Sequence, residues 1–113
     1  MTAPPRILIA EPNADVRSFL ELTVERLGYE PVAPEPAPAS ADLDAIIVEP
    51  GCALGRSIVH RLGDDAPPVI CLSIYPREDG LEPAGSVAYL VKPSSGAAIA
   101  DALRSVVADR RRL

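Results

Sequence analysis

Residues 6–13 read Arg6-Ile7-Leu8-Ile9-Ala10-Glu11-Pro12-Asn13, and this stretch decides the fold. After its first residue, the run up to Ala10 is apolar without a break. A strand covered on both faces shows this pattern, whereas a strand with one solvent-exposed face alternates apolar and polar residues. The run ends at Glu11, and Asn13 is a favourable N-cap for a helix. The stretch therefore predicts a buried strand that leads into a helix.

A helix is predicted after this strand because apolar residues recur there at helical spacing. Gly28 follows the last of them and favours the end of the helix. The aromatic residues Phe19 and Tyr29 are expected in or near the core, because large apolar side chains gain most from burial. The apolar positions of this helix are Val16, Phe19, Leu20, Val24 and Leu27.

Apolar runs of two kinds alternate along the rest of the chain. Short runs rich in β-branched residues and bounded by Pro or Asp are typical of doubly covered strands. Stretches with apolar residues every three or four positions are typical of helices. Strands are predicted at 30–33, 45–48, 69–72 and 87–91, and helices at 54–62 and 97–113, the last capped by Ser94 or Ser95. This alternation predicts an α/β three-layer sandwich, a doubly wound sheet of five parallel strands with right-handed crossovers.

Two crossovers hold too many prolines for a full helix. Pro34, Pro36 and Pro38 favour an extended, polyproline-like crossing over residues 34–43. In the segment 74–85, prolines and glycines leave room for about one helical turn. The expected fold therefore has its second helix replaced by a Pro-rich crossing and its fourth helix reduced to a vestige.

Length and charge narrow the classes of function. Residues 1–113 are expected to form a single domain, because this length holds one core. The net charge of −5 argues against a nucleic-acid partner, which needs a basic face. No apolar stretch is long enough to span a membrane and no secretory signal is present, so a cytoplasmic protein without a membrane partner is expected. Cys52 and Cys71 are expected to be reduced thiols.

Polar side chains stand where four predicted strands end, namely Glu11, Glu49, Ser73 and Lys92. In open parallel sheets, the carboxyl ends of the strands meet at one edge, where ligand sites form. Two carboxylates, one hydroxyl and one ammonium are therefore expected to converge. The glycine-rich phosphate loop of nucleotide enzymes and the G-x-S-x-G elbow of hydrolases are both missing, so the chain is not expected to be an enzyme.

Five segments of the sequence carry a family resemblance: 6–17 (RILIAEPNADVR), 27–29 (LGY), 44–49 (DAIIVE), 69–73 (VICLS) and 89–93 (YLVKP). Together they resemble the receiver domain of bacterial response regulators, and the match covers almost the whole chain. The resemblance implies a flavodoxin-like sheet with strand order 2-1-3-4-5 and a signalling role in two-component or phosphorelay systems.

The resemblance assigns roles to the strand-end residues, and two positions depart from the family pattern. Glu49 stands where the family has its phospho-accepting Asp. Pro12 replaces the second residue of the acidic pair, of which Glu11 is the first. The residues that match the family's conformational switch are Ser73, Tyr89, Lys92 and Pro93.

The resemblance also implies a metal, because the family binds Mg²⁺ through its acidic pair. Here Glu11 and Glu49, with the backbone carbonyl of Gly51, remain as ligands of a weak Mg²⁺ site, and no other cofactor is expected. The Glu carboxylate is one methylene longer than that of Asp, which displaces its oxygen by about 1 Å, and such an error costs about 100-fold in rate. Phosphoryl transfer to Glu49 is therefore disfavoured.

The favoured interpretation is an atypical, stand-alone pseudo-receiver that acts by phosphorylation-independent protein–protein interaction. Its partner is an unidentified protein or a second copy bound through 87–91 and 97–113. Glu49, Lys92 and Ser73 form either a fixed hydrogen-bonded cluster or a plain structural ion pair at the sheet edge. Two alternatives remain: a phosphorylatable single-domain response regulator that uses Glu49 and Mg²⁺, and a small-molecule sensor with a groove beside the sheet.

Overall fold

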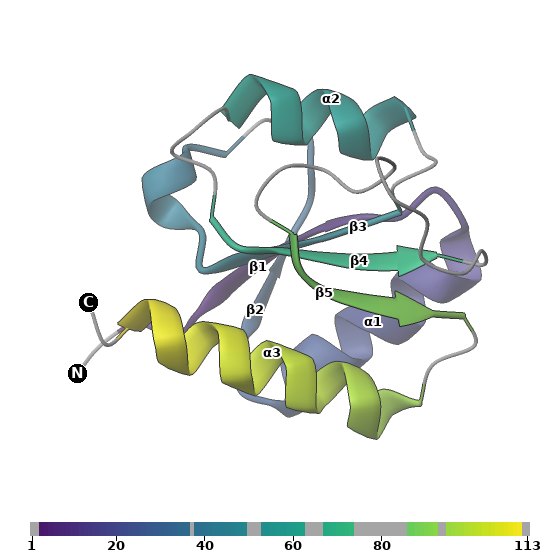
Figure 1. Ribbon diagram of the computed structural model, residues 1–113, viewed down its shortest axis with the longest axis vertical. Coiled ribbons are helices and arrows are strands. Elements are labelled where there is room, and N and C mark those ends of the chain that lie inside the picture. The colour runs from purple at the N-terminus through teal and green to yellow at the C-terminus, as the bar shows by residue number, and fades with distance from the viewer. Residues whose placement is uncertain are drawn as a thin grey trace.

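The computed structural model describes residues 3–36, 38–49, 53–62, 67–73, 86–92 and 95–111. Strands and helices alternate along the chain, with one helix after β1, one after β3 and one after β5 (Figure 1). The strands are β1 (Arg6–Ala10), β2 (Glu30–Val32), β3 (Ala45–Val48), β4 (Val69–Ser73) and β5 (Ser86–Val91). The helices are α1 (Ala14–Arg26), α2 (Ala53–Leu62) and α3 (Gly96–Arg111), with a 3-10 turn at Ser40–Asp42.

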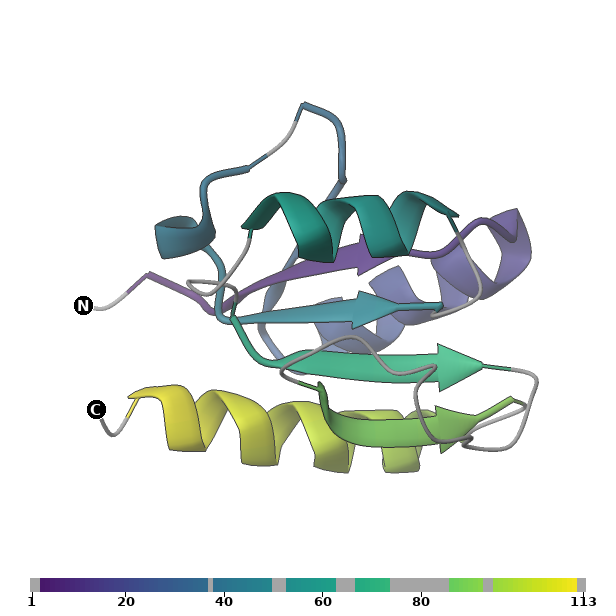
Figure 2. The ribbon, with the colours of Figure 1, turned by 45° about the horizontal axis from the view of Figure 1, so that its top comes forward.

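The five strands form one sheet in the order β2-β1-β3-β4-β5, and every neighbouring pair is parallel. The predicted strand order and the doubly wound three-layer architecture are confirmed. Helices α1 and α3 lie on one face of the sheet and α2 lies on the other (Figure 2). Both faces of the central strands are therefore covered.

The core consists of two clusters, one on each face of the sheet, and neighbouring residues of β1 contribute to opposite clusters. This explains why the strand is apolar without alternation. The cluster under α1 and α3 contains Ile7, Ile9, Leu20, Val24, Ala45, Ile47, Ile70, Leu72, Ile99, Leu103, Val106 and Val107. The cluster under α2 contains Leu8, Ala10, Leu43, Ile46, Val48, Ile58, Val69 and Cys71.

Helix α1 begins and ends where the sequence predicts. The Asn13 side-chain oxygen accepts hydrogen bonds from the backbone N–H groups of Asp15 and Val16, at 3.0 and 3.1 Å. After the helix, Gly28 adopts a φ of 82°, a left-handed conformation that glycine tolerates without strain.

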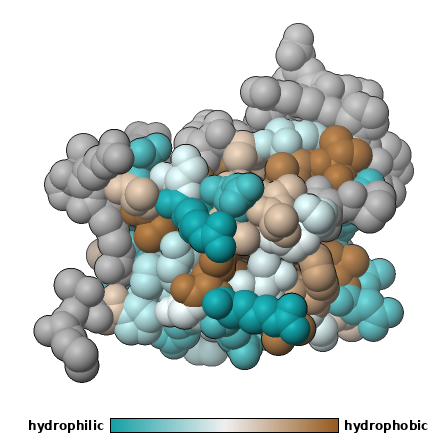
Figure 3. Space-filling model, turned by 90° about the horizontal axis from the view of Figure 1, so that it is seen from below, coloured by the Kyte–Doolittle hydropathy of each residue, from teal (hydrophilic) through white to brown (hydrophobic). Residues whose placement is uncertain are grey.

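The aromatic residues near α1 differ in burial. Tyr29 is half-buried and packs against the cluster under α1 and α3, as expected. The expectation for Phe19 was wrong, because its side chain is 43% exposed. Leu20 is fully buried on the stripe that faces the sheet, whereas Phe19 is turned toward the start of α3 near Gly96. In Figure 3, which views the face that α1 and α3 form, hydrophobic residues lie in separate patches among hydrophilic ones.

The crossing after β2 has no α-helix in its described residues, as the prolines predict. It is not extended throughout, because a 3-10 turn forms at Ser40–Asp42, where the Asp42 N–H donates to the Ala39 carbonyl at 3.0 Å. This turn follows the last proline of the segment, where backbone N–H donors are again available. The predicted vestigial helix at 74–85 lies outside the described residues.

Helix α3 is capped by Ser95, one of the two predicted caps, whose hydroxyl accepts from the Ala98 N–H at 3.1 Å. Its buried residues face β3 and β5 across the sheet surface. None of the helices in the described part of the chain combines the length and the apolar character that a bilayer crossing requires.

Candidate functional site

The register of the sheet brings the predicted strand-end residues to one edge. Ala10 pairs with Val48, so Glu11 and Glu49 follow at the same height on neighbouring strands. Ser73 pairs with Val91, so Lys92 lies one residue beyond the end of β4. The Lys92 backbone N–H extends this pairing by donating to the Ser73 carbonyl at 2.6 Å.

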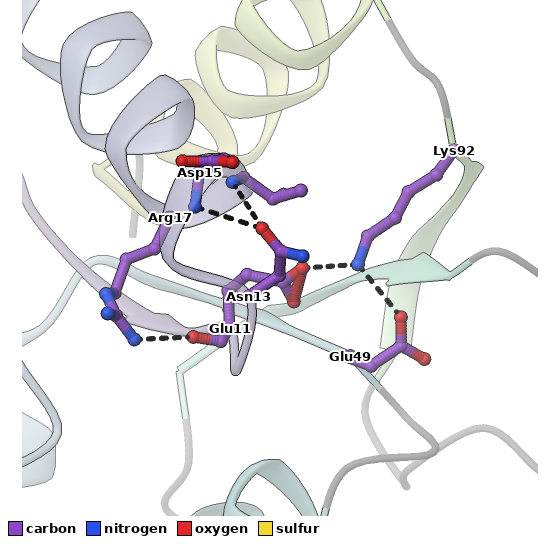
Figure 4. A network of polar contacts seen from close by, with 7 residues as sticks. Glu11, Asn13, Asp15, Arg17, Glu49 and Lys92 are labelled. Atoms are coloured by element: carbon purple, nitrogen blue, oxygen red, sulfur yellow. Dashed lines mark hydrogen bonds and ion pairs between the residues drawn. The ribbon is translucent and has the colours of Figure 1, made fainter.

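The Lys92 side chain contacts both carboxylates of this edge (Figure 4). Its Nζ donates a hydrogen bond to Glu11 Oε1 and lies 3.2 Å from Glu49 Oε2. The lysine comes from β5 and the two glutamates follow β1 and β3, so the contact joins three strands at one point. The predicted ion pair between Glu49 and Lys92 is present, and the structure adds the contact with Glu11.

All three charged side chains are shielded from water. The exposed fraction is 2% for the side chain of Glu11, 12% for Glu49 and 15% for Lys92. Burial alone lowers the pKa of Lys92, but hydrogen bonds and opposite charges from Glu11 and Glu49 outweigh it and raise the pKa above its usual value. The ammonium is therefore firmly protonated at neutral pH, where it faces two carboxylates.

Lys92 is the single lysine of the chain, and the other ten basic side chains are arginines. An ammonium is a compact point charge whose three donors rotate freely, so it fits between two carboxylates that approach from different strands. A planar guanidinium is larger and fixed in shape. The isolated lysine in an arginine-rich sequence is the signal that marks this position, and our sequence analysis did not use it.

The neighbours of Glu11 hold its backbone in place. Arg17 Nη1 donates to the Glu11 backbone carbonyl at 3.0 Å, from the first turns of α1 (Figure 4). Pro12 is exposed and offers no side-chain oxygen, and Asn13 starts the helix. The loop after β1 therefore presents one carboxylate to the site.

Helix α2 approaches the site very closely at Gly55. A methyl group at this position would lie 3.1 Å from the Glu49 backbone carbonyl and 3.2 Å from Val48 Cβ. Such distances are shorter than ordinary van der Waals contacts, so a larger residue at this position would require α2 or the end of β3 to move by a few tenths of an ångström.

The other predicted site residues have different surroundings. Ser73 is buried, and its backbone carbonyl binds Lys92 as described. Tyr89 is half-buried and packs against the cluster under α2. The metal ligand Gly51 and the switch residue Pro93 lie outside the described residues. The roles assigned to these side chains stay predictions.

The fold that carries this site is also found in proteins of known structure. No protein-family model and no curated protein matches the sequence. Solved structures do match. A CheY-like receiver domain from Methanospirillum hungatei JF-1 is 15% identical, with a TM-score of 0.77 over 97% of this chain and 98% of that one. A receiver protein from Burkholderia phymatum is 20% identical, with a TM-score of 0.74 over 92% and 95%.

A third match is the receiver domain of the sensor histidine kinase PA1611 from Pseudomonas aeruginosa PAO1. It is 20% identical, with a TM-score of 0.71 over 94% of this chain and 99% of that one. That domain holds a magnesium ion in its active-site cleft. Each neighbour is matched over nearly its whole length, so the chain has the fold of response-regulator receiver domains.

Proposed function

We propose that this chain is a receiver-like binding module that acts through contacts with proteins and without phosphorylation of Glu49. The observation that carries the proposal is the position of Lys92 Nζ, which contacts both Glu11 and Glu49. Two acidic groups that receiver chemistry would use for metal binding and phosphoryl acceptance are already engaged with a cation of the chain itself. The site is then a fixed structural element.

The donor set does not suit Mg²⁺, which prefers six oxygen ligands from carboxylates, water and phosphate. Pro12 supplies no oxygen, and a metal ion at Glu11 and Glu49 would lie beside the Lys92 ammonium, a like charge in a poorly solvated setting. Among the described residues, no three acidic, histidine or cysteine side chains form a metal-binding group. This supports a site that works without the metal, and no step of the proposed function uses it.

The length of the Glu49 side chain supports the same conclusion. Phosphoryl transfer requires an attacking oxygen aligned with the phosphorus and a cation that neutralises the phosphoryl oxygens. Glu49 Oε2 is held 3.2 Å from Lys92, and Gly55 packs against its backbone, so the carboxylate has little freedom to align. We therefore favour an ion pair that holds one conformation of this edge.

For the protein contact, we favour the surface of β5 and α3. Strand β5 lies at the edge of the sheet, and Val91 at its end is 45% exposed. The outer face of α3 carries the exposed pair Asp101 and Arg104, joined at 3.1 Å. A second copy of the chain is the occupant that we test first, and sedimentation equilibrium of the parent and of Val91→Asp reports its assembly. A dimer that the substitution dissociates supports this surface, and a monomer at all concentrations directs the search to other proteins.

The test of phosphorylation is intact mass after incubation with acetyl phosphate, with and without Mg²⁺. We expect no phosphoryl group on the parent protein. Glu49→Asp together with Pro12→Asp restores both missing groups and should acquire label that depends on Mg²⁺. Glu49→Asp alone is the matched control, because it restores the acceptor without the second acid.

The opposite result is equally clear. If the parent protein gains a phosphoryl group and Glu49→Gln abolishes the gain, the chain is a phosphorylatable response regulator and the proposal fails. If neither the parent nor the double variant is labelled, Glu49 and Pro12 do not account for the missing chemistry, and this explanation of the unphosphorylated site fails.

A further inference from the structure

A groove of about 280 Å³ lies between α1 and the segment that includes and follows β2, and Arg17 is one of its lining residues. Its floor is apolar and includes Ile9, Val32 and Pro34. Three charged residues also line it: Arg17 and Glu21 from α1, and Glu35 from the segment after β2. The volume is near the lower end of the roughly 300–1,000 Å³ found for small-molecule sites, so it suits a small ligand.

The charged groups of the groove have unused binding capacity. Arg17 and Glu21 are half-buried, yet no ion pair joins them in the described part of the chain. The Arg17 guanidinium donates one hydrogen bond, to the Glu11 carbonyl, and a guanidinium has five donors. The carboxylates of Glu21 and Glu35 likewise make no hydrogen bond or ion pair within the described residues. Glu35 is exposed, whereas Arg17 and Glu21 are half-buried, and half-buried charges without partners favour a ligand that supplies them.

We propose that this groove binds a free α-amino acid with a cationic side chain. Arg17 and Glu21 stand one helical turn apart, and side chains at this spacing are neighbours on a helix surface. They match the carboxylate and the ammonium that an amino acid carries on one carbon atom. Glu35, from the segment after β2, takes the side-chain cation, and the aliphatic stem covers Val32 and Pro34.

The charge balance favours a basic amino acid over a neutral one. One arginine and two glutamates give the groove a net charge of −1, and a basic amino acid carries one negative and two positive groups. Each group of the ligand then meets an opposite charge. This inference is independent of the proposed protein contact, because it concerns residues outside the Glu11, Glu49 and Lys92 cluster.

Arg17 joins the groove to that cluster. Its guanidinium holds the backbone carbonyl of Glu11, whose side chain contacts Lys92. A ligand carboxylate on the free donors of Arg17 restrains the same guanidinium. Ligand binding is therefore expected to shift the NMR signal of the single lysine, although the ligand does not touch it.

The test is an NMR titration of the isotope-labelled protein with L-lysine and three analogues, each of which lacks one group. They are 1,5-diaminopentane without the carboxylate, 6-aminohexanoate without the α-ammonium and L-norleucine without the side-chain cation. We expect saturable shifts at the groove with L-lysine, and about tenfold weaker binding of each analogue, because each loses one charge-assisted hydrogen bond.

Variants assign the contacts. Glu35→Gln should remove the preference for L-lysine over L-norleucine, which a general loss of structure would not do. Arg17→Lys should weaken L-lysine binding and leave diaminopentane binding unchanged. Glu25→Gln is the matched control for Glu21→Gln, because Glu25 is exposed on the same helix and does not line the groove.

Three results overturn the inference. One is the absence of saturable shifts up to about 10 mM, an affinity too weak for three charge contacts. Another is equal binding of L-lysine and diaminopentane, which means that Arg17 recognises no carboxylate. The third is equal weakening by Glu25→Gln and Glu21→Gln. None of them affects the acetyl phosphate test, so this inference and the proposed function fail separately.

Discussion

The sheet carries charged residues at both of its ends, and the two ends differ in their distance from water. At the carboxyl edge, Lys92 lies between Glu11 and Glu49, and none of the three side chains is more than 15% exposed. At the amino edge, Arg6 Nε lies 3.5 Å from Glu30 Oε2, and these side chains are 34% and 53% exposed. The carboxyl edge therefore pairs buried charges, and the amino edge pairs solvated ones.

The amino edge relies instead on hydrogen bonds between the backbone of Arg6 and Asp44, one of them accepted by the Asp44 carboxylate. The Arg6 N–H donates to Asp44 Oδ2 at 3.0 Å, and the Asp44 N–H donates to the Arg6 carbonyl at 2.8 Å. These bonds join the starts of β1 and β3. Opposite charges alone therefore do not make a site. Solvated ion pairs contribute little to stability, whereas buried charges require all of their partners.

The strongest test of this difference is Lys92→Met. It leaves two buried carboxylates beside each other without a cation, which is expected to cost about 3 to 5 kcal/mol in the free energy of unfolding. Urea denaturation measures this loss in the free energy of unfolding. Adding Glu11→Gln and Glu49→Gln to this variant should restore much of the loss. If Lys92→Met costs less than 1 kcal/mol, roughly the value of a solvated pair, the edge is not an essential ion cluster.

A second test targets the packing that fixes Glu49. Gly55→Ala places a methyl group 3.1 Å from the Glu49 carbonyl, and overpacking of this kind costs about 1 to 3 kcal/mol. Gly96→Ala is the control, because a methyl group there lies 3.7 Å from its nearest neighbour, Phe19 Cζ. Thermal unfolding should separate the two variants. Equal midpoints would mean that α2 adjusts without strain.

A third and smaller effect is expected from titration. Because the folded-state pKa of Lys92 is raised, the stability that the ammonium contributes is complete below the unfolded value of about 10.5. That stability is lost as the pH rises through the folded pKa. For the parent protein, the free energy of unfolding should be lower at strongly alkaline pH than at neutral pH. For Lys92→Met, the difference between the two pH values should be smaller. A parallel decline in both proteins would assign the pH dependence to other groups.

The smallest change is expected at the amino edge. Arg6→Met removes the exposed pair with Glu30 and the exposed hydrogen bond from Arg6 Nη1 to the Asp42 carbonyl, at 3.4 Å. It leaves the main-chain bonds of Arg6 with Asp44 intact, so the free energy of unfolding should change by about 0 to 1 kcal/mol. Added salt should weaken this small contribution further, and it should affect the Lys92 cluster less. A larger loss for Arg6→Met than for Lys92→Met would reverse the comparison between the two edges.

The sequence predicts the central strands well, because residues buried on both faces leave an unbroken apolar run. It also predicts the N-caps, since the side chains of Asn13 and Ser95 accept hydrogen bonds from backbone N–H groups at most three residues away. Helical spacing alone does not separate Phe19 from its buried neighbour Leu20. Which residue of a wide apolar stripe faces the sheet depends on how the helix is rotated, and contacts with elements distant in the sequence decide that rotation.

The contacts of the site are predicted in part, because the Glu49–Lys92 ion pair is expected from the sequence and the contact of Lys92 with Glu11 is not. Lys92 and Glu11 are 81 positions apart in the sequence. Their contact depends on the pairing of β4 with β5, whose register shifts between Val69 and Ile70. Such a shift leaves no pattern in the apolar residues of either strand. The expected convergence of strand ends was therefore correct, whereas the bridge from Lys92 to Glu11 required the structure.

The single lysine also makes the motion of this edge measurable by chemistry. Amine acylation requires a neutral amine in contact with the reagent, and the Nζ of Lys92 is shielded while its ion pairs hold. Its acylation rate, compared with that of a lysine in a short peptide, therefore reports how often the carboxyl edge opens. Once the acyl group is attached, the positive charge is lost, and the edge cannot close again around the same cation.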